Sequence, residues 1–386
     1  MKVKTKGTRS LPYLLSFLVV APIALAQQNA QQACDSVTSY NEIQPITGPA
    51  AAAVAGADAG EGRGRGQGGR GGRAARPEGP LVNGYPAGRG NSKPEITLIP
   101  KAPMLPYKAV EPPPPPAGTA WGNLGAVGFL SNGHLLVFNR KPQFTLVEYD
   151  ADGRLVRSID ENIAGRPHGM RIDKSDNIWI TDVACHTVMK LNSAGDVLLT
   201  IGTKGKAGAW DEAAGAHLLN QPTDIGFGKN GDIFVTTGHG QPDPTVLRFD
   251  KNGKYITSWA MKRPEGASIV HSVMVDKDGN VMVTERDFGI IDVFDPNGKR
   301  LREMHLQNLT CTLYIDPKGQ LWTTAGFDGM ILRLDWDGKV LGWLGQSGPT
   351  PLDFTEAHSM AISADMKTIY AADSAGAKLH KFVATN

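Results

Sequence analysis

The sequence is poor in cysteine, in long apolar runs and in net charge, and each shortage excludes a class of protein. Its 386 residues include 3 cysteines, which leave at least one thiol unpaired and exclude a disulfide-stabilised scaffold. A formal net charge of +2, with 20% charged residues, argues against a dedicated nucleic-acid-binding protein. After the N-terminal segment no apolar run approaches the roughly 20 residues that span a bilayer, so we expect no membrane span.

The N-terminus has the pattern of a secretory signal peptide over residues 1–26. Four basic residues precede the apolar run LPYLLSFLVVAPIA, which ends in the small-residue motif Ala24-Leu25-Ala26. We predict cleavage after Ala26 and a secreted or periplasmic protein. Cys34 lacks the leucine and small residues that precede the cysteine of a lipoprotein, so we predict no lipid anchor.

Residues 27–100 differ in composition from the rest of the chain. They carry stretches such as GRGRGQGGRGGRAAR at 62–76 and too few large apolar residues to form a core. We predict a disordered Ala/Gly/Arg/Pro-rich tail. Export disfavours RNA binding by the Arg/Gly text, and loose attraction to anionic cell-envelope polymers is the alternative. The proline run 112–116 then predicts a stiff extended spacer next to the folded region.

The remainder of the chain, residues 101–386, is built from six similar segments with almost no helical periodicity. Each has an apolar strand, an Asp/Asn/Gly-containing turn and a second strand, followed by a third strand and usually a fourth. The segments are 124–140, 166–182, 221–240, 269–287, 309–326 and 356–376. Four short strands repeated every 40 to 55 residues predict an all-β fold, a six-bladed β-propeller. The last blade lacks a fourth strand of its own, so we expect Tyr107 to Val110 to complete it.

The residues repeated in the turns and second strands need no functional explanation. Asp, Asn and Gly in DKSDN, KNGD, DKDGN and DPKGQ suit tight turns between antiparallel strands, which we favour over calcium binding. Trp179, Trp259, Trp322 and Trp343 recur at equivalent strand positions, and we expect them to pack between blades.

Histidines recur at one position of alternate repeats. Four residues before the apolar residue of each first strand stand, in chain order, Gly125, His168, Thr223, His271, Cys311 and His358. First strands line the channel of a propeller, so blades two, four and six should direct three imidazoles at its axis. Three neutral nitrogen donors with a fourth position open are a ligand set for zinc, and we predict a Zn²⁺ site at His168, His271 and His358.

The ends of the second strands should open onto the same face as the histidines. Arg140 and Arg286 are equivalent there in blades one and four, and two guanidinium groups could clamp a carboxylate. The alternative is two solvated or acid-paired arginines.

His239 follows Thr237-Gly238 and could act as acid or base. Cys311 is either a fourth ligand or a small buried residue, and it should not pair with Cys185 across the ring.

Several motifs resemble the peptidyl-α-hydroxyglycine α-amidating lyases, a branch of the NHL-repeat propellers. They are TDVACHTVMKL, NQPTDI, RPHGM, VHSVMV, the Glu-Arg-Asp stretch at 285–287 and EAHSMAIS. The resemblance implies that the three histidines match the family's zinc ligands and that Arg140 and Arg286 match its active-site arginines. The implied reaction cleaves the C–N bond of a carbinolamide, giving an amide and an aldehyde-acid such as glyoxylate.

The chain departs from the family pattern at two positions. His239 stands where the family has its tyrosine base, so either imidazole replaces phenolate or the chemistry differs. Ser359 stands where the family has an aspartate linked to a structural calcium, which makes Ca²⁺ doubtful.

Three functions therefore remain. The first is an exported zinc-dependent lyase acting, as a monomer, on a small carboxylate-bearing or peptide substrate. The second is a metal-dependent lactonase-like hydrolase, although such sites usually use Glu, Asn and Asp. The third is a non-catalytic exported propeller that binds peptide or glycan.

Overall fold

The computed structural model describes residues 81, 82, 85, 86 and 99–385, except 141–143, 160–162, 240–242, 262 and 264–268. The predicted signal peptide and nearly all of the predicted tail lie outside the described residues. Within the tail, the two-residue strands β1 (Leu81–Val82) and β2 (Tyr85–Pro86) pair antiparallel. No helix of the described part of the chain is long and apolar enough to cross a membrane.

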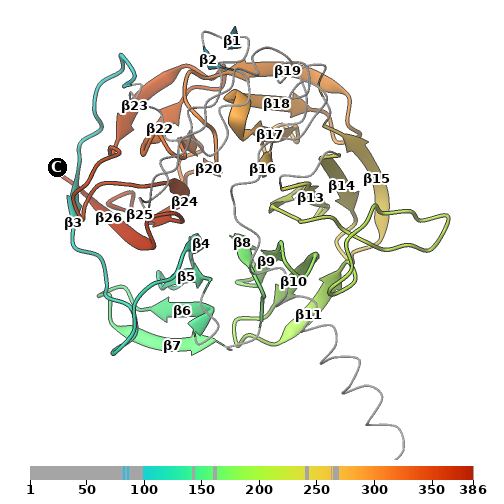
Figure 1. Cartoon of the computed structure of the whole chain (residues 1–386), viewed down its shortest axis with the longest axis horizontal. Coiled ribbons are helices and arrows are strands. Elements are labelled where there is room, and N and C mark those ends of the chain that lie inside the picture. The colour runs from blue at the N-terminus through green and yellow to red at the C-terminus, as the bar shows by residue number, and fades with distance from the viewer. Residues whose placement is uncertain are drawn as a thin grey trace, which may run out of the picture.

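The domain is a ring of four-stranded antiparallel sheets around a central axis, with the first strand of each sheet innermost (Figure 1). Blade one consists of β4 (Leu124–Phe129), β5 (Leu135–Asn139), β6 (Leu146–Tyr149) and β7 (Leu155–Ile159). Blade two consists of β8 (Pro167–Ile172), β9 (Ile178–Asp182), β10 (Thr187–Leu191) and β11 (Val197–Ile201). Blade three consists of β12 (Asp224–Phe227), β13 (Ile233–Thr237), β14 (Thr245–Phe249) and β15 (Tyr255–Ala260).

The second half of the ring repeats this order. Blade four consists of β16 (Val270–Val275), β17 (Val281–Glu285), β18 (Ile290–Phe294) and β19 (Arg300–His305), with the 3₁₀ helix η3 (Arg286–Phe288) after β17. Blade five consists of β20 (Leu313–Ile315), β21 (Leu321–Thr324), β22 (Ile331–Leu334) and β23 (Val340–Leu344). Blade six consists of β24 (Ala357–Ile362), β25 (Thr368–Asp373), β26 (Lys378–Ala384) and β3 (Tyr107–Val110). The predicted all-β, six-bladed propeller is confirmed.

Blade six is completed by a strand from the other end of the domain. Strand β3 pairs antiparallel with β26, with Tyr107 opposite Ala384 and Val110 opposite Lys381. The sequence predicted this closure, because the last repeat lacks a fourth strand of its own. It joins the first and last parts of the domain by backbone hydrogen bonds, so the ring has no open sheet at that point.

Apolar side chains between neighbouring blades form the core, which leaves the axis to polar residues. Trp179 of blade two packs against Ile225 and Leu247 of blade three, and Trp322 of blade five packs against Ile362 of blade six. Trp322 is 1% exposed, so truncating it to alanine would cost about 3–5 kcal/mol of unfolding free energy. The packing predicted for these tryptophans is confirmed.

The turns between strands use their acidic residues to cap backbone amides. In the DKDGN turn, Asp276 Oδ1 accepts hydrogen bonds from the amides of Asp278 and Asn280, both at 2.8 Å. Gly279 there has a φ of +93°, which favours glycine over any residue with a Cβ. The same aspartate arrangement recurs at Asp250 and Asp316, so the interpretation of these residues as turn chemistry is confirmed.

Candidate metal centre

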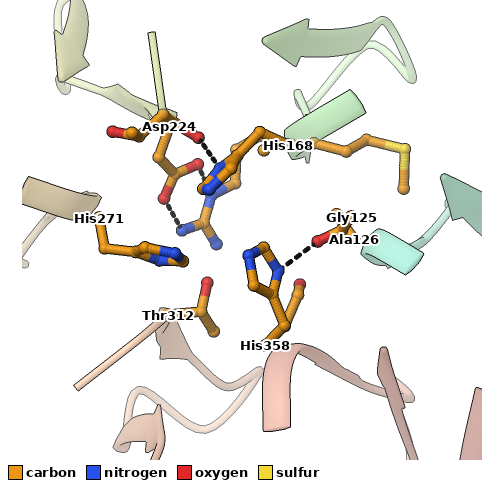
Figure 2. A pocket seen from close by; sticks show the side chains of 12 residues that line it. Gly125, Ala126, His168, Asp224, His271, Thr312 and His358 are labelled. Atoms are coloured by element: carbon orange, nitrogen blue, oxygen red, sulfur yellow. Dashed lines mark hydrogen bonds and ion pairs between the residues drawn. The ribbon is translucent and has the colours of Figure 1, made fainter. Parts of the chain in front are cut away.

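His168, His271 and His358 meet at the axis of the ring. They lie on the innermost strands β8, β16 and β24, and Figure 2 shows the three imidazoles facing one another across the pocket. The ring centroids of His168 and His271 are 4.6 Å apart, and that of His358 is 4.8 Å from each of them. The side chains are 1%, 3% and 4% exposed, so protein groups rather than solvent surround them. The repeat register thus places the three histidines together as expected.

The intervening blades fix the orientation of these rings. His168 Nδ1 lies 2.8 Å from the Thr223 carbonyl oxygen, His271 Nδ1 lies 3.2 Å from that of Cys311, and His358 Nδ1 lies 2.7 Å from that of Gly125. Each acceptor is the residue at the same position of the next blade. Because a carbonyl only accepts, Nδ1 must carry the hydrogen, and Nε2 keeps its lone pair. The carbonyl groups of blades one, three and five therefore orient the rings so that the Nε2 lone pairs face the axis.

The Nε2 atoms test whether a metal ion fits between these rings. Those of His168 and His271 are buried and have no hydrogen-bond partner within the described part of the chain. A buried nitrogen lone pair left without a partner is costly, and a metal ion would satisfy it. Among the described residues, His168, His239 and His271 lie close enough together to hold a metal ion, and nitrogen donors of this kind suit zinc.

The surroundings keep the imidazoles neutral. Burial lowers the pKa of His168 well below its usual range, with His239, His358 and Arg140 acting in the same direction against the Thr223 hydrogen bond. Burial likewise lowers the pKa of His271, helped by His168, His358 and Arg286. Neutral imidazole is the form that ligates a metal, so His168 and His271 have the protonation state that metal binding requires.

His239 reaches the same point from the loop after β13. Its ring centroid is 4.8 Å from that of His168 and 5.8 Å from that of His271. The candidate ligand atoms of these three residues all lie within 4.8 Å of one another. The neighbouring Gly238 has a φ of +98°, and a Cβ there would lie 2.6 Å from Pro244 Cα, so the tight loop requires glycine. His239 is therefore close enough to exchange a proton with a group bound at the metal or to bind the metal itself.

The two predicted arginines lie near this cluster, and both contact other protein groups. Arg140 Nε donates to the Pro167 carbonyl oxygen at 2.7 Å, and Nη1 donates to Ser374 Oγ at 3.0 Å. Arg286 Nε is 3.1 Å from Asp287 Oδ1, and its Nη1 is 3.8 Å from Glu356 Oε1. Burial alone would lower the pKa of Arg286, but Asp287, Cys311 and Glu356 hold it above its usual range. Arg286 therefore stays charged beside the imidazoles.

A third arginine, Arg166, lies in this cluster, although it was not among the site residues predicted from the sequence. It is 8% exposed, and after burial its charge is the strongest influence lowering the pKa of His239, ahead of Arg286. The available signal was its place two residues before His168 in RPHGM. Its amide donates to Asp182 Oδ1 at 2.9 Å, as the amide of Glu356 donates to Asp373 Oδ1 at 2.9 Å. The aspartates that end β9 and β25 therefore hold the loops that lead into two histidine strands.

Cys311 serves the site through its backbone. Its thiol is buried and free, and burial raises the pKa of that thiol well above its usual range against the effect of Arg286. Its carbonyl oxygen lies 3.2 Å from His271 Nδ1 and is the group of Cys311 that contacts the axial histidines. Cys185 is disulfide-bonded and Cys311 is free, so the expectation that these two do not pair is confirmed.

Comparison with curated proteins gives a consistent set of relatives. Peptidyl-glycine alpha-amidating monooxygenase A of Xenopus laevis is 27% identical over 259 residues, which are 61% of this chain and 26% of the frog protein. Peptidyl-alpha-hydroxyglycine alpha-amidating lyase 1 of Drosophila melanogaster is 26% identical over 263 residues, 60% of this chain and 47% of the fly protein. The chain resembles the amidating lyases. The resemblance extends to NHL repeat-containing protein 3 of Homo sapiens, at 27% identity over 161 residues, 39% of this chain and 45% of that protein.

The chain matches less than half the length of each of these relatives, and no family model matches the sequence. Among solved structures, a streptogramin B lyase has a TM-score of 0.51 at 15% identity, covering 72% of this chain and 97% of that one. A gluconolactonase from Xanthomonas campestris has a TM-score of 0.52 at 15% identity, covering 74% and 99%. At this identity the two structures show a shared fold.

Proposed function

We propose that this protein is an exported, zinc-dependent amidating lyase that cleaves the C–N bond of a carbinolamide bearing a carboxylate. The products would be an amide and glyoxylate or a related aldehyde. The observation that carries the proposal is the set of three imidazoles at the axis, each with Nδ1 beside a carbonyl oxygen of the next blade, next to His239. The resemblance to amidating lyases supplies the reaction class.

Each group has a defined task in this reaction. His168, His271 and His358 would hold the ion, which when bound supplies Lewis acidity at the substrate hydroxyl. His239 accepts the hydroxyl proton as the carbonyl double bond forms and the C–N bond breaks. The amide nitrogen leaves with the bonding electron pair and receives that proton from His239, so the reaction needs no added water or oxidant.

We assign the binding of the substrate carboxylate to Arg140 and Arg286. Arg140 and Arg286 lie in blades one and four, and both raise the positive potential at His239. A carboxylate bound between them would replace part of the interaction that Arg286 makes with Asp287 and Glu356. We propose a small carboxylate-bearing or peptide substrate bound to one propeller, with the protein acting as a monomer.

Export is part of the proposal because a signal peptide is predicted over residues 1–26. N-terminal sequencing of the protein recovered outside the cytoplasm should begin at Gln27. A mature chain that starts at Met1 and stays in the cytoplasm would contradict export without affecting the chemistry.

The decisive test is glyoxylate release from α-hydroxyhippurate by the zinc-loaded protein, with His271→Ala as the inactive comparison. Equal rates in the two proteins would overturn the lyase assignment. Zinc binding without turnover would instead favour a non-catalytic propeller that binds peptide or glycan. Hydrolysis of a lactone panel without glyoxylate release would favour the lactonase-like alternative.

A further inference from the structure

An ion pair lines the pocket that the three histidines share. Arg171 lies on β8, three residues after His168, and Asp224 is the first residue of β12. Arg171 Nε lies 3.0 Å from Asp224 Oδ1, and its Nη2 lies 2.5 Å from Oδ2. Their side chains are 13% and 5% exposed. Figure 2 shows Asp224 on the pocket wall beside His168.

Hydrogen bonds extend this pair to the strand that carries His271. Ser272 follows His271 on β16, and its Oγ donates to Asp224 Oδ2 at 2.6 Å. Arg171 Nη2 donates to the same Oγ at 3.0 Å, and the amide of Leu313 in blade five does so at 3.0 Å. One carboxylate of blade three is thereby bonded to both neighbouring histidine strands.

The strands joined in this way approach each other closely. A Cβ at Gly169, next to His168, would lie 2.5 Å from the Thr223 carbonyl oxygen and 3.0 Å from Asp224 Cα. Only glycine permits this spacing, and the Thr223 carbonyl is the group that orients His168. A small shift between blades two and three would therefore displace the imidazole directly.

We propose that Arg171, Asp224 and Ser272 form a channel brace that holds His168 and His271 at the separation needed to share one metal ion. The three are positioning residues, since they act through the histidine strands. The inference rests on the proposed metal site and adds the residues that preorganise it.

A contribution to folding stability does not by itself explain the Arg171–Asp224 ion pair. Replacing a buried ion pair by apolar residues of similar volume is often neutral or stabilising. The bidentate Arg171–Asp224 geometry instead fixes distance and direction between strands, because the planar fork has one favourable alignment. Preorganised ligand geometry is reflected in metal affinity.

The test compares zinc affinity in Arg171→Met with that in a matched control. Arg248 and Asp232 form a similar pair elsewhere in blade three, with Nε 2.7 Å from Oδ2 and side chains 16% and 8% exposed. Arg248→Met therefore removes an equivalent ion pair away from the histidine pocket. We expect Arg171→Met to raise the zinc Kd about tenfold or more and to change the visible spectrum of the Co²⁺-loaded protein. Arg248→Met should leave both as in wild type.

The outcomes separate this inference from the proposed function. Wild type that binds no zinc would overturn the metal site itself. Wild type that binds zinc, with Arg171→Met matching it or Arg248→Met weakening binding equally, would overturn the brace alone. Ser272→Ala keeps the ion pair and covers the case in which Arg171→Met fails to fold. It should raise Kd by a factor of about two to ten, and an unchanged Kd would contradict the brace.

Discussion

The Nδ1 atom of His168 lies 2.8 Å from the carbonyl oxygen of Thr223, the residue that holds the corresponding place in the next blade. The same relation links His271 to Cys311 and His358 to Gly125. Blades that carry an axial histidine therefore alternate around the ring with blades whose backbone carbonyl oxygen accepts the hydrogen bond. A backbone carbonyl needs no particular side chain, which explains how glycine, threonine and cysteine can occupy equivalent positions around one site.

Loss of one axial histidine should remove the metal. His168→Ala leaves two of the three donors, so we expect less than about half an equivalent of zinc after purification, against about one for wild type. Elemental analysis measures this directly. His305→Ala, at the 41%-exposed side chain of His305 in β19, is the control and should retain its zinc. Full zinc occupancy in His168→Ala would rule out the proposed ligand set.

Replacing His239 should separate proton transfer from metal binding. If His239 is the base, His239→Gln loses about 10²–10⁴-fold in turnover. It also keeps its zinc and the Co²⁺ spectrum of wild type. Loss of zinc or an altered Co²⁺ spectrum would identify His239 as a fourth ligand, and undiminished turnover would remove it from the mechanism.

Arg140 should matter only for substrates with a carboxylate. Lysine keeps the charge but loses the planar fork, so Arg140→Lys should lower kcat/KM by about ten- to a hundredfold. A carboxamide analogue of the substrate should be turned over equally by wild type and variant. Arg157→Lys is the control, because Arg157 pairs with Glu148 on the outer strands of blade one. An equal loss on both substrates would indicate a structural role for Arg140.

Acid should destabilise the metal-free protein. Burial lowers the pKa of His168, His239 and His271, whereas the unfolded chain has the ordinary value of 6.5. Below that pH the unfolded state binds more protons, so the free energy of unfolding falls with acidity. Each histidine contributes up to about 1.4 kcal/mol per pH unit. Urea denaturation at several pH values should show a shallower pH dependence of the unfolding free energy in His239→Gln, and an identical slope would contradict the lowered pKa of His239.

The sequence predicted the features that recur in every blade. It did not predict the side-chain contacts between neighbouring blades. Register alone located the six blades, the closing strand at Tyr107 and the meeting of His168 with His271 and His358. Arg166, Arg171 and Asp224 are not repeated at the equivalent positions of the other blades, so superposing the repeats could not reveal them. Their contacts depend on how closely two strands approach at Gly169, a distance that periodicity does not encode.

The bonding of β3 to β26 gives the ring a seam, and the seam belongs to the blade that carries His358. Trimming of the N-terminal region up to residue 101 would leave the seam intact, together with the hydrogen bonds of Leu105 to Trp343 and of Pro106 to Thr385. A cut beyond Val110 would strip the outermost strand from blade six and expose the backbone of β26 as an edge open to strands of other molecules. Any proteolytic maturation of this protein therefore has a fixed limit, because a longer cut would remove the contacts that close the ring.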